Sequence, residues 1–306
     1  MRKTSSSICA SSFACALQKM NDILGPDRLW IPNPDPSTPM SVRAYQNQAR
    51  TAYVTITDGG RRDMTNIEGI TGKASLDHEE LNADLREFGV DIQFEPFRPT
   101  EFGTIGLYEV GRSWVIEGMK IPDLRLKDNT TVPGFRSSGG YEVVVGLDSN
   151  PTVKLYTERD DRHIVIMCDD GEYDGFELHE QAVRMEEESQ NGEPIVCGGV
   201  QVPMVDLNQQ PDISRLIGLT THKDDNPLDR FHISQALQQN IFQMDHLGFL
   251  AKSATALAAR RSTAMRKPPP PDFIVDGPFI AAVVADYGVE FVAHVWPDTM
   301  RDPKRG

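Results

Sequence analysis

Short runs rich in β-branched and other apolar residues dominate the second half of the chain, and such runs are typical of β-strands. The runs are YEVVVGL, TVKLYT, RHIVIMC, VQVPMVDL, FIAAVVA and VEFVAHVW, separated by Gly, Asp, Asn and Pro. Between them, GFELHEQAVRMEEE predicts a helix, ISRLIGL a shorter one, and ISQALQQNIFQM a helix or turn that ends as a strand. Because strands follow one another without a strand–helix–strand rhythm, the pattern predicts an α+β fold with large mixed sheets.

The beginning of the chain mixes helical and strand patterns. Apolar residues at Ile8, Phe13, Leu17 and Ile23, with small residues between them, predict one buried helix over SSSICASSFACALQKMNDIL. LWIPNPDPSTPM predicts a proline-rich connector, and AYVTITDGG, from Ala52, predicts a strand and a turn.

Two further patterns precede the middle of the chain. SLDHEELNADLREFG predicts a helix with Ser75 as its N-terminal cap and Gly89 just past its end. TIGLYEVGRSWVIEGM predicts two successive strands with a kink at Gly111.

The charge balance argues against nucleic-acid partners. The 45 Asp and Glu residues outnumber the 31 Lys and Arg residues, so the net charge is -14 and the chain repels phosphate backbones. The cationic cluster consists of Arg260, Arg261, Arg266 and Lys267. No apolar run reaches the length of a membrane span, since FIAAVVA is followed by Asp286, and we expect no membrane partner.

The cysteines and the N-terminus bear on the compartment. Cys9, Cys15, Cys168 and Cys197 form no CxxC pair, so we interpret them as reduced, buried thiols rather than as a disulfide framework. The stretch MRKTSSSICASSFACAL is too rich in serine for a good signal peptide. We expect a cytoplasmic protein, with secretion as the alternative.

Conventional catalytic motifs are absent from the sequence. It contains no GxSxG, no GxxxxGK[ST], no GxGxxG and no HExxH. His179 and Glu180 are predicted to form a surface pair on a helix, and residues 186–188 a solvated acidic face. The acidic run DHEE, residues 77–80, suits the first turn of a helix better than a cation site. We therefore expect no enzyme, no metal and no cofactor.

The segment GFLAKSATALAARRSTAMRKPPPPDF, residues 248–273, does not fit a core element or an ordinary turn. It has few bulky apolar groups, a long run of small residues, two adjacent arginines and four prolines. Four consecutive prolines form a stiff extended arm that lacks donors for strand pairing. Such a segment suits an exposed loop that presents its arginines to a partner.

The C-terminal third resembles the serpins, in an ordered set of segments. The segments are VQVPMVDLNQQPDISRLIGL, HISQALQQNIFQMDHLGFLAKSAT and DFIVDGPFIAAVVADYGVEFVAHVWPD. The hinge match keeps Asp245, Gly248, Ala251, Ala254 and Thr255, and the closing match keeps Phe273, Asp276, Pro278, Phe279, Phe291 and Pro297. Upstream, IGLYEVGRSW, LRLKDNTTVPGF and SSSICASSFACAL are also similar to serpin segments, so the resemblance covers roughly half the chain.

The resemblance implies a fold and an organisation. It implies one serpin-like α+β domain over residues 1–306, with large antiparallel sheets, surrounding helices and a reactive-centre loop over residues 248–272. The hinge would comprise Gly248, Phe249, Ala251, Ser253, Ala254 and Thr255. Trp114 would lie where the loop enters the main sheet. The family pattern also implies a monomer without a metal.

The loop itself shows the alternation that an inserting strand needs. If Phe249 enters first, beside Trp114, both charges up to Arg260 fall on the opposite face, with Leu250. Two bulky rings would then compete for one site. The chain departs from the family here, because inhibitors carry threonine or serine in place of Phe249, and it lacks the usual glutamate near His246. It is also shorter than a usual serpin before Trp114.

The bond between Arg261 and Ser262 is the predicted cleavage site. It lies thirteen residues beyond Gly248, about 43 Å if fully extended at roughly 3.3 Å per residue. A basic residue suits a trypsin-like serine protease. The bonds near Arg260 and after Arg266 or Lys267 are alternatives. The sequence thus predicts a suicide-substrate protease inhibitor. The alternatives are a non-inhibitory serpin-like binding or carrier protein and, less favoured, a serpin scaffold recruited as an enzyme.

Overall fold

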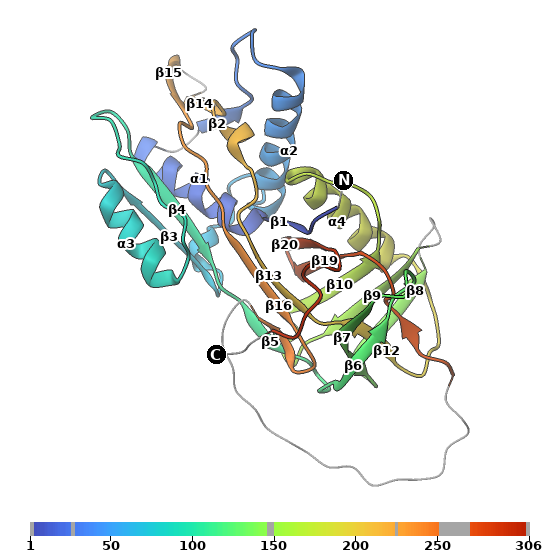
Figure 1. Cartoon of the computed structure of the whole chain (residues 1–306). Helices are drawn as coiled ribbons and strands as arrows, with labels where there is room; N and C mark the ends of the chain where they lie inside the picture. Colours follow the sequence, from blue (N-terminus) through green and yellow to red (C-terminus); the bar gives the residue numbers. More distant parts are fainter. Residues whose placement is uncertain (1–2, 26–27, 146–149, 224–225, 251–269, 304–306) are drawn as a thin grey trace.

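A seven-stranded antiparallel sheet forms the centre of the computed structural model, which describes residues 3–25, 28–145, 150–223, 226–250 and 270–303 (Figure 1). Its strands, in spatial order, are β1 (Ser6–Cys9), β20 (Gly288–Val295), β19 (Phe279–Ala285), β10 (Arg162–Cys168), β9 (Pro151–Tyr156), β8 (Tyr141–Val145) and β11 (Glu193–Pro194). All seven residues of β19 are buried. This strand is therefore covered on both faces.

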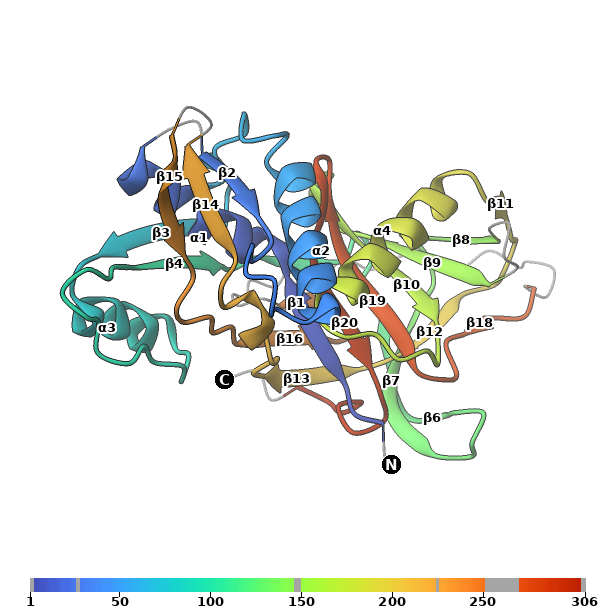
Figure 2. The ribbon, with the colours of Figure 1, turned by 90° about the horizontal axis from the view of Figure 1, so that it is seen from above.

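The two faces of this sheet belong to two separate cores. In β19, Ile280, Ala282 and Val284 point into one core, whereas Phe279, Ala281 and Val283 point into the other, as the pleat requires. Helices α1 (Ala10–Leu24), α2 (Met40–Ile56) and α4 (Phe176–Gln190) contribute to the first core, and Figure 2 shows α2 and α4 over the sheet.

Two four-stranded sheets pack against the second core. One contains β18 (Phe273–Ile274), β12 (Val200–Pro203), β7 (Thr131–Ser137) and β6 (Met119–Arg125). The other contains β13 (Val205–Gln209), β16 (Asn240–Met244), β17 (Gly248–Leu250) and β5 (Gly111–Ser113).

Smaller elements complete the described part of the chain. β3 (Ile70–Ser75) and β4 (Gly103–Tyr108) form a two-stranded sheet beside α3 (His78–Phe88). β15 (Asn226–His232), β14 (Thr220–Lys223) and β2 (Arg28–Ile31) form a three-stranded sheet. The 3₁₀ helices η1 (Met64–Asn66) and η2 (Ser214–Leu216) lie in connections.

The predicted α+β class is confirmed, and so are all six strand runs of the second half, VQVPMVDL forming two strands, β12 and β13. Several local predictions are wrong. The stretch from Ala52 lies in α2 instead of a strand, because Tyr45, Ala49, Tyr53 and Ile56 bury one face at helical spacing. The predicted N-terminal helix begins only at Ala10, since residues 6–9 pair with β20.

Three corrections concern caps and connections. The cap of α3 is Asp77, whose carboxylate accepts a hydrogen bond from the Glu79 amide at 2.9 Å, while Ser75 ends β3. The proline-rich connector begins with β2, and the helix predicted over ISRLIGL is only the 3₁₀ turn η2. Gly89 ends α3 in the left-handed conformation, as predicted.

The expected surface pair is wrong at His179, and the solvated acidic face over residues 186–188 is wrong at Glu186 but holds at Glu187, which is exposed. His179 is 3% exposed, and its Nε2 lies 3.0 Å from the Val289 carbonyl oxygen. Burial lowers the pKa of His179, so its imidazole is a neutral part of the core at pH 7. Glu186 is buried too, with Ser189 and Gln190 donating to its carboxylate. Both side chains lie on the buried face of α4. The sequence pattern alone did not indicate which polar residues of this helix face the core.

Candidate functional site

Three residues at the start of the predicted loop already form a strand. β17 lies antiparallel between β16 and β5, with Phe249 opposite both Met244 and Arg112, and Leu250 opposite Gln243 and Gly111. A side chain on Gly248 would bring a Cβ atom within 2.1 Å of the Arg112 carbonyl oxygen. Close approach of two backbones therefore requires glycine at the position where β17 begins.

Phe249 is buried in the second core beside Trp114. It is 2% exposed, and the centroids of the two rings lie 6.0 Å apart. The Trp114 indole stacks on Phe135 on another side and donates from Nε1 to the Asp245 carbonyl oxygen at 2.8 Å. The expected competition between Phe249 and Trp114 for one site is wrong, because each ring has its own place.

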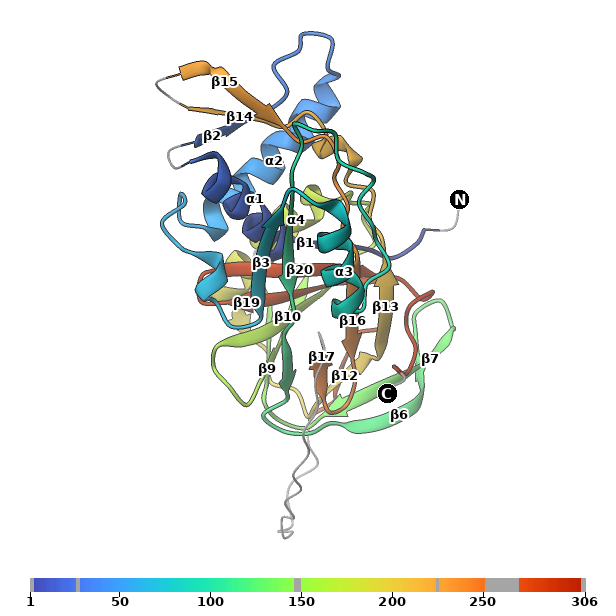
Figure 3. The same cartoon turned by 90° about the vertical axis from the view of Figure 1, so that its left-hand side faces the viewer.

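A cavity begins at Leu250, the last residue of β17. Its volume is about 1030 Å³, and it lies between β4 on one side and the stretch 230–243 on the other. Figure 3 faces this side of the molecule, with β3, β4 and α3 on one side and β13, β16 and β17 on the other. Among the described residues, β4 pairs only with β3, so its second edge faces the cavity. We call this space the sheet gap.

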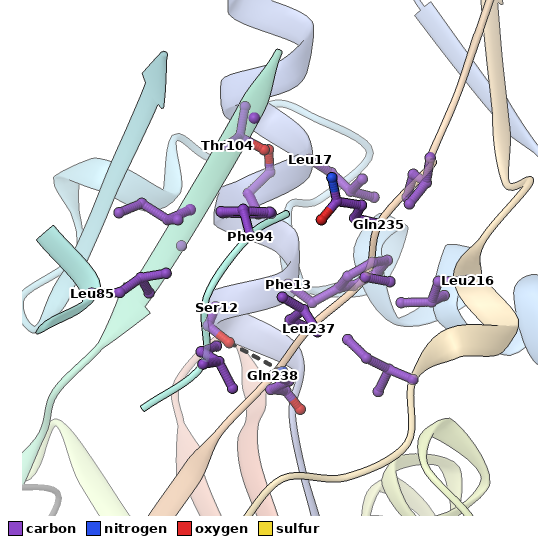
Figure 4. Close-up of a pocket in the computed structure, with 18 of the residues that line it drawn as sticks. Ser12, Phe13, Leu17, Leu85, Phe94, Thr104, Leu216, Gln235, Leu237 and Gln238 are labelled. Carbon is purple, nitrogen blue, oxygen red and sulfur yellow. Dashed lines mark hydrogen bonds between the residues drawn. The ribbon is translucent and has the colours of Figure 1, made fainter. Parts of the chain in front are cut away.

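Helix α1 forms the floor of the sheet gap (Figure 4). Thr104 of β4 donates from its hydroxyl to the Ala16 carbonyl oxygen at 2.9 Å. From the opposite side, the Gln238 amide accepts from the Cys9 backbone N–H at 3.2 Å and donates to the Cys9 carbonyl oxygen at 2.9 Å. Phe13 and Leu17 line the cavity between these anchors. Both walls are thereby tied to one rigid helix.

The two thiols of α1 and its cap are not nucleophiles. Burial raises the pKa of Cys9 to about 11, and it raises the pKa of Cys15 to about 11 as well. Both groups are neutral thiols at pH 7, in agreement with the interpretation of the cysteines as small buried side chains.

Ion pairs fix β5, the wall beside Phe249. The Arg112 guanidinium binds Asp161 through two nitrogens, at 2.5 and 3.0 Å. Burial acts to raise the pKa of Asp161, but the hydrogen bonds and charge of Arg112 outweigh it and hold that pKa below its usual value. Arg162 next to it binds Glu290, which is fully buried, at 2.6 Å. This wall is therefore fixed to the central sheet.

The far end of the loop is anchored as well. Directly after the four prolines, Asp272 accepts two hydrogen bonds from Arg136, at 2.7 and 2.8 Å, and one from Gln201 at 2.9 Å. β18 follows and pairs with β12 in parallel. Residues 251–269 lie outside the described part of the chain, which is therefore held at β17 before them and at Asp272 after them.

We expect the Asp272 anchor to stabilise the protein in a pH-dependent way. The hydrogen bonds from Arg136 lower the pKa of Asp272. Stabilisation from a depressed carboxyl pKa is present above the unfolded value, about 3.9, and is lost as the pH falls through the folded value. Asp272→Asn should therefore melt below wild type at pH 7, and the two midpoints should converge as the pH falls below about 4.

The control for this experiment is Asp302→Asn, which breaks an exposed pair with Lys120. Exposed pairs contribute little, so its midpoint should stay near wild type at both pH values. An Asp272→Asn midpoint equal to wild type at pH 7 would show that the anchor does not stabilise the fold.

Most predicted loop residues lie outside the described part of the chain. They are the hinge residues Ala251, Ser253, Ala254 and Thr255 and the cleavage-site residues Arg261 and Ser262. Gly248, Phe249 and Trp114 are described and lie together. Sequence reasoning missed the sheet gap, because its two walls, β4 and the stretch 230–243, are more than a hundred residues apart in the chain.

The described residues contain neither a metal-binding cluster nor a membrane-spanning helix. No group of three or more His, Cys, Asp or Glu side chains there could hold a metal ion. No helix in the same ranges has the length and apolar character that a membrane crossing requires.

The chain is similar to known proteins in structure but not in sequence. No protein-family profile matches the chain, and no curated protein matches it in sequence. Solved structures do match along nearly its whole length. Serpin48 of the insect Tenebrio molitor is 11% identical, with 96% of this chain and 92% of that chain covered and a TM-score of 0.54.

Two other matches have similar extents. A complex of thyroxine-binding globulin with thyroxine is 12% identical, covering 95% of this chain and 92% of that one, with a TM-score of 0.55. The mouse protein-Z dependent protease inhibitor is 13% identical, covering 96% and 91%, with a TM-score of 0.51. These descriptions name a serpin, a binding globulin and a protease inhibitor, and none names an enzyme. Because the matches extend over nearly the whole chain, they show that this chain has the serpin fold.

Proposed function

We propose that the protein inhibits a serine protease as a suicide substrate, by inserting its cleaved loop into the sheet gap. The observation that supports the proposal is the position of β17 in the sheet. Its three residues already occupy a strand position between β16 and β5, and the cavity continues from Leu250 along the direction in which the strand would extend. Among the named neighbours, the mouse protein is described as a protease inhibitor.

The register of β17 indicates where an inserting strand would run. Phe249 is opposite Met244 and Arg112, so a strand continued without a bulge places Thr255 opposite Gln238 and Gly106. These positions lie over α1, where the Ser12 carbonyl oxygen is only 1.9 Å from a Cβ built on Gly106. Space here is narrow, which favours the small side chains of the loop over bulky ones.

The outward face of the same register also fits. Lys252 falls opposite Glu109, whose side chain is half-buried at the edge of the gap. Opposite charges directly across an antiparallel pair stabilise it. The loop thus carries small residues toward α1 and a cation toward the acidic edge.

The chemistry of the proposed reaction belongs to the protease. Its serine Oγ attacks the carbonyl carbon of Arg261, the bond to Ser262 breaks, and Ser262 leaves with a new amino terminus. The acyl-enzyme is then carried along as the loop enters the sheet gap, before water hydrolyses the ester. The arginine favours a trypsin-like protease, with the bonds after Arg260 and Arg266 as alternatives.

Replacing Arg261 with alanine should abolish capture of trypsin. Wild type incubated with trypsin should give a covalent complex that survives a denaturing gel, and trypsin with a blocked active serine should give none. Arg261→Ala should lose that complex while keeping the melting profile of the uncleaved protein. If it captures trypsin as well as wild type does, the reactive bond lies elsewhere, and Arg260→Ala and Arg266→Ala locate it.

A second candidate is a carrier of an apolar small molecule, and the sheet gap is the observation that favours it. A cavity of about 1030 Å³ is large enough for a drug-sized ligand. The described match with thyroxine-binding globulin shows that one protein of this fold binds such a molecule. A carrier would be nicked cleanly by trypsin, without a covalent complex.

A further inference from the structure

The wall of the sheet gap that contains β4 carries two charges, one near each end. Between residues 101 and 109 the charged side chains are Glu101 and Glu109, eight residues apart, and both line the cavity. The opposite wall, over residues 233–243, contains no Asp, Glu, Lys, Arg or His. Along these two facing stretches, the only formal charges are therefore the two carboxylates.

Both glutamates lie on the face of β4 that is turned away from α1. Thr104 and Gly106 contact α1, so the period of two places the odd-numbered residues from 101 to 109 on the other face. In the middle of that face, Ile105 and Leu107 belong to the small core formed with α3. An acidic group thus lies at each end of a covered apolar stretch.

The sequence that follows β17 has a matching charge pattern. From residue 249 to residue 260 the charged residues are Lys252 and Arg260, again eight residues apart. The residues that share a strand face with these cations and lie between them are Ala254, Ala256 and Ala258. The segment therefore has a cation at each end of a run of small side chains.

The register of β17 brings the two patterns together. β17 places Leu250 opposite Gly111. A strand continued from there without a bulge has its first cation opposite Glu109 and its second opposite Glu101. The alanines between them then lie beside the stretch that α3 covers, where only small side chains fit.

Alanine alone gives such a strand little preference for one register. A slip of two residues keeps every side chain on its own face and replaces one alanine by another. The same slip moves both cations away from both carboxylates by about 6.6 Å, at roughly 3.3 Å per residue. The charges therefore distinguish registers that the alanines do not.

We propose that Glu101 and Glu109 fix the register of a strand that enters the sheet gap, by pairing with two cations eight residues apart. The inference rests on the proposed function, and it gives two adjacent arginines different roles. Arg261 is recognised by the protease, whereas Arg260 pairs with Glu101 once insertion is complete. The Glu101 carboxylate is already oriented, since it accepts a hydrogen bond from the Arg98 N–H at 2.8 Å. Opposite charges directly across an antiparallel pair stabilise it, and like charges destabilise it.

The test exchanges charges between the wall and a capped synthetic peptide, AKSATALAAR, which has the sequence of residues 251–260. Titration on a native gel should show that Glu101→Lys binds this peptide about fivefold more weakly than wild type does. A peptide with glutamate at its last position should reverse that order. A peptide with glutamate at its second position should not rescue Glu101→Lys, but it should rescue Glu109→Lys.

Glu87→Lys is the matched control, because it makes the same change of charge at an exposed residue of α3. It should bind each peptide as wild type does. Glu101→Gln keeps the shape of the side chain and should bind AKSATALAAR with an affinity between those of wild type and Glu101→Lys, so it tests the pair even if the lysine variants do not fold.

Two results would contradict the inference, and they differ in what they leave standing. If Glu87→Lys loses as much affinity as Glu101→Lys, or if the exchanged peptides rescue neither lysine variant, the register pairs are overturned and the proposed function stays intact. If wild type binds none of the peptides, the sheet gap does not accept a strand, and the proposed function falls together with the register pairs.

Discussion

Cleavage of the loop at Arg261 should raise the thermal midpoint of the protein by roughly 10–20 °C. A strand that continues β17 would bond to β4 on one side and to the 234–242 stretch on the other. At about 1 kcal/mol for each hydrogen bond, and less the cost of ordering the loop, the gain is of order 5–10 kcal/mol. A gain of 1 kcal/mol moves the midpoint of a chain this long by roughly 2 °C.

The experiment is a pair of melting curves, before and after limited digestion with trypsin. The triple variant Arg260→Ala, Arg261→Ala, Arg266→Ala, treated in the same way, is the control, because it keeps the protease present without cleavage at any of the three candidate bonds. Its midpoint should stay at the uncleaved value. A cleaved wild-type protein with an unchanged midpoint would mean that the sheet gap is not a strand slot, and the carrier function would then be favoured.

Replacing Phe249 with alanine should destabilise the uncleaved protein by about 3–5 kcal/mol, a typical cost for removing a buried aromatic ring. The ring is 2% exposed, and Trp114 and the rest of the second core surround it. Without the ring, little besides backbone pairing holds β17, and we expect β17 to separate from β16 and β5. Denaturant unfolding measures the loss of free energy.

Leu250→Ala is the matched control for this prediction, since Leu250 is the next residue of β17 and points to the other face, where it is half-buried. Its cost should be about 1 kcal/mol or less, for a partly exposed aliphatic side chain. Similar losses in the two variants would show that the burial of Phe249 does not hold β17 in the sheet.

The two ends of the loop are held by different means, and this affects how it is presented. At β17 the hold is a buried ring and three residues of strand pairing. At the other end it is the ion pair of Asp272 with Arg136, whose side chains are 18% and 25% exposed. A partly solvated ion pair responds to pH and a buried ring does not, so acid should loosen the second end first.

The local elements of this protein follow from short stretches of its sequence. β19 and β20 come from apolar runs bounded by Gly, Pro and Asp. Helix α3 ends at Gly89 because glycine readily adopts the left-handed conformation that closes a helix. The ordered segments of the C-terminal third were enough to suggest the serpin fold, which the solved structures then confirmed at 11–13% identity. Secondary-structure propensity and hydrophobic periodicity depend on only a few neighbouring residues, so a short stretch of sequence is enough to predict these elements.

Long-range contacts decided the rest. Residues 6–9 are a strand because β20, almost three hundred residues away, offers them an edge, and α2 is helical despite its β-branched residues because its buried face packs on the first core. The sheet gap exists because β4 and the 234–242 stretch face each other without pairing. The bond from Gln235 to Glu95 spans 140 residues, and only the packing of both walls on α1 brings such partners within hydrogen-bonding distance.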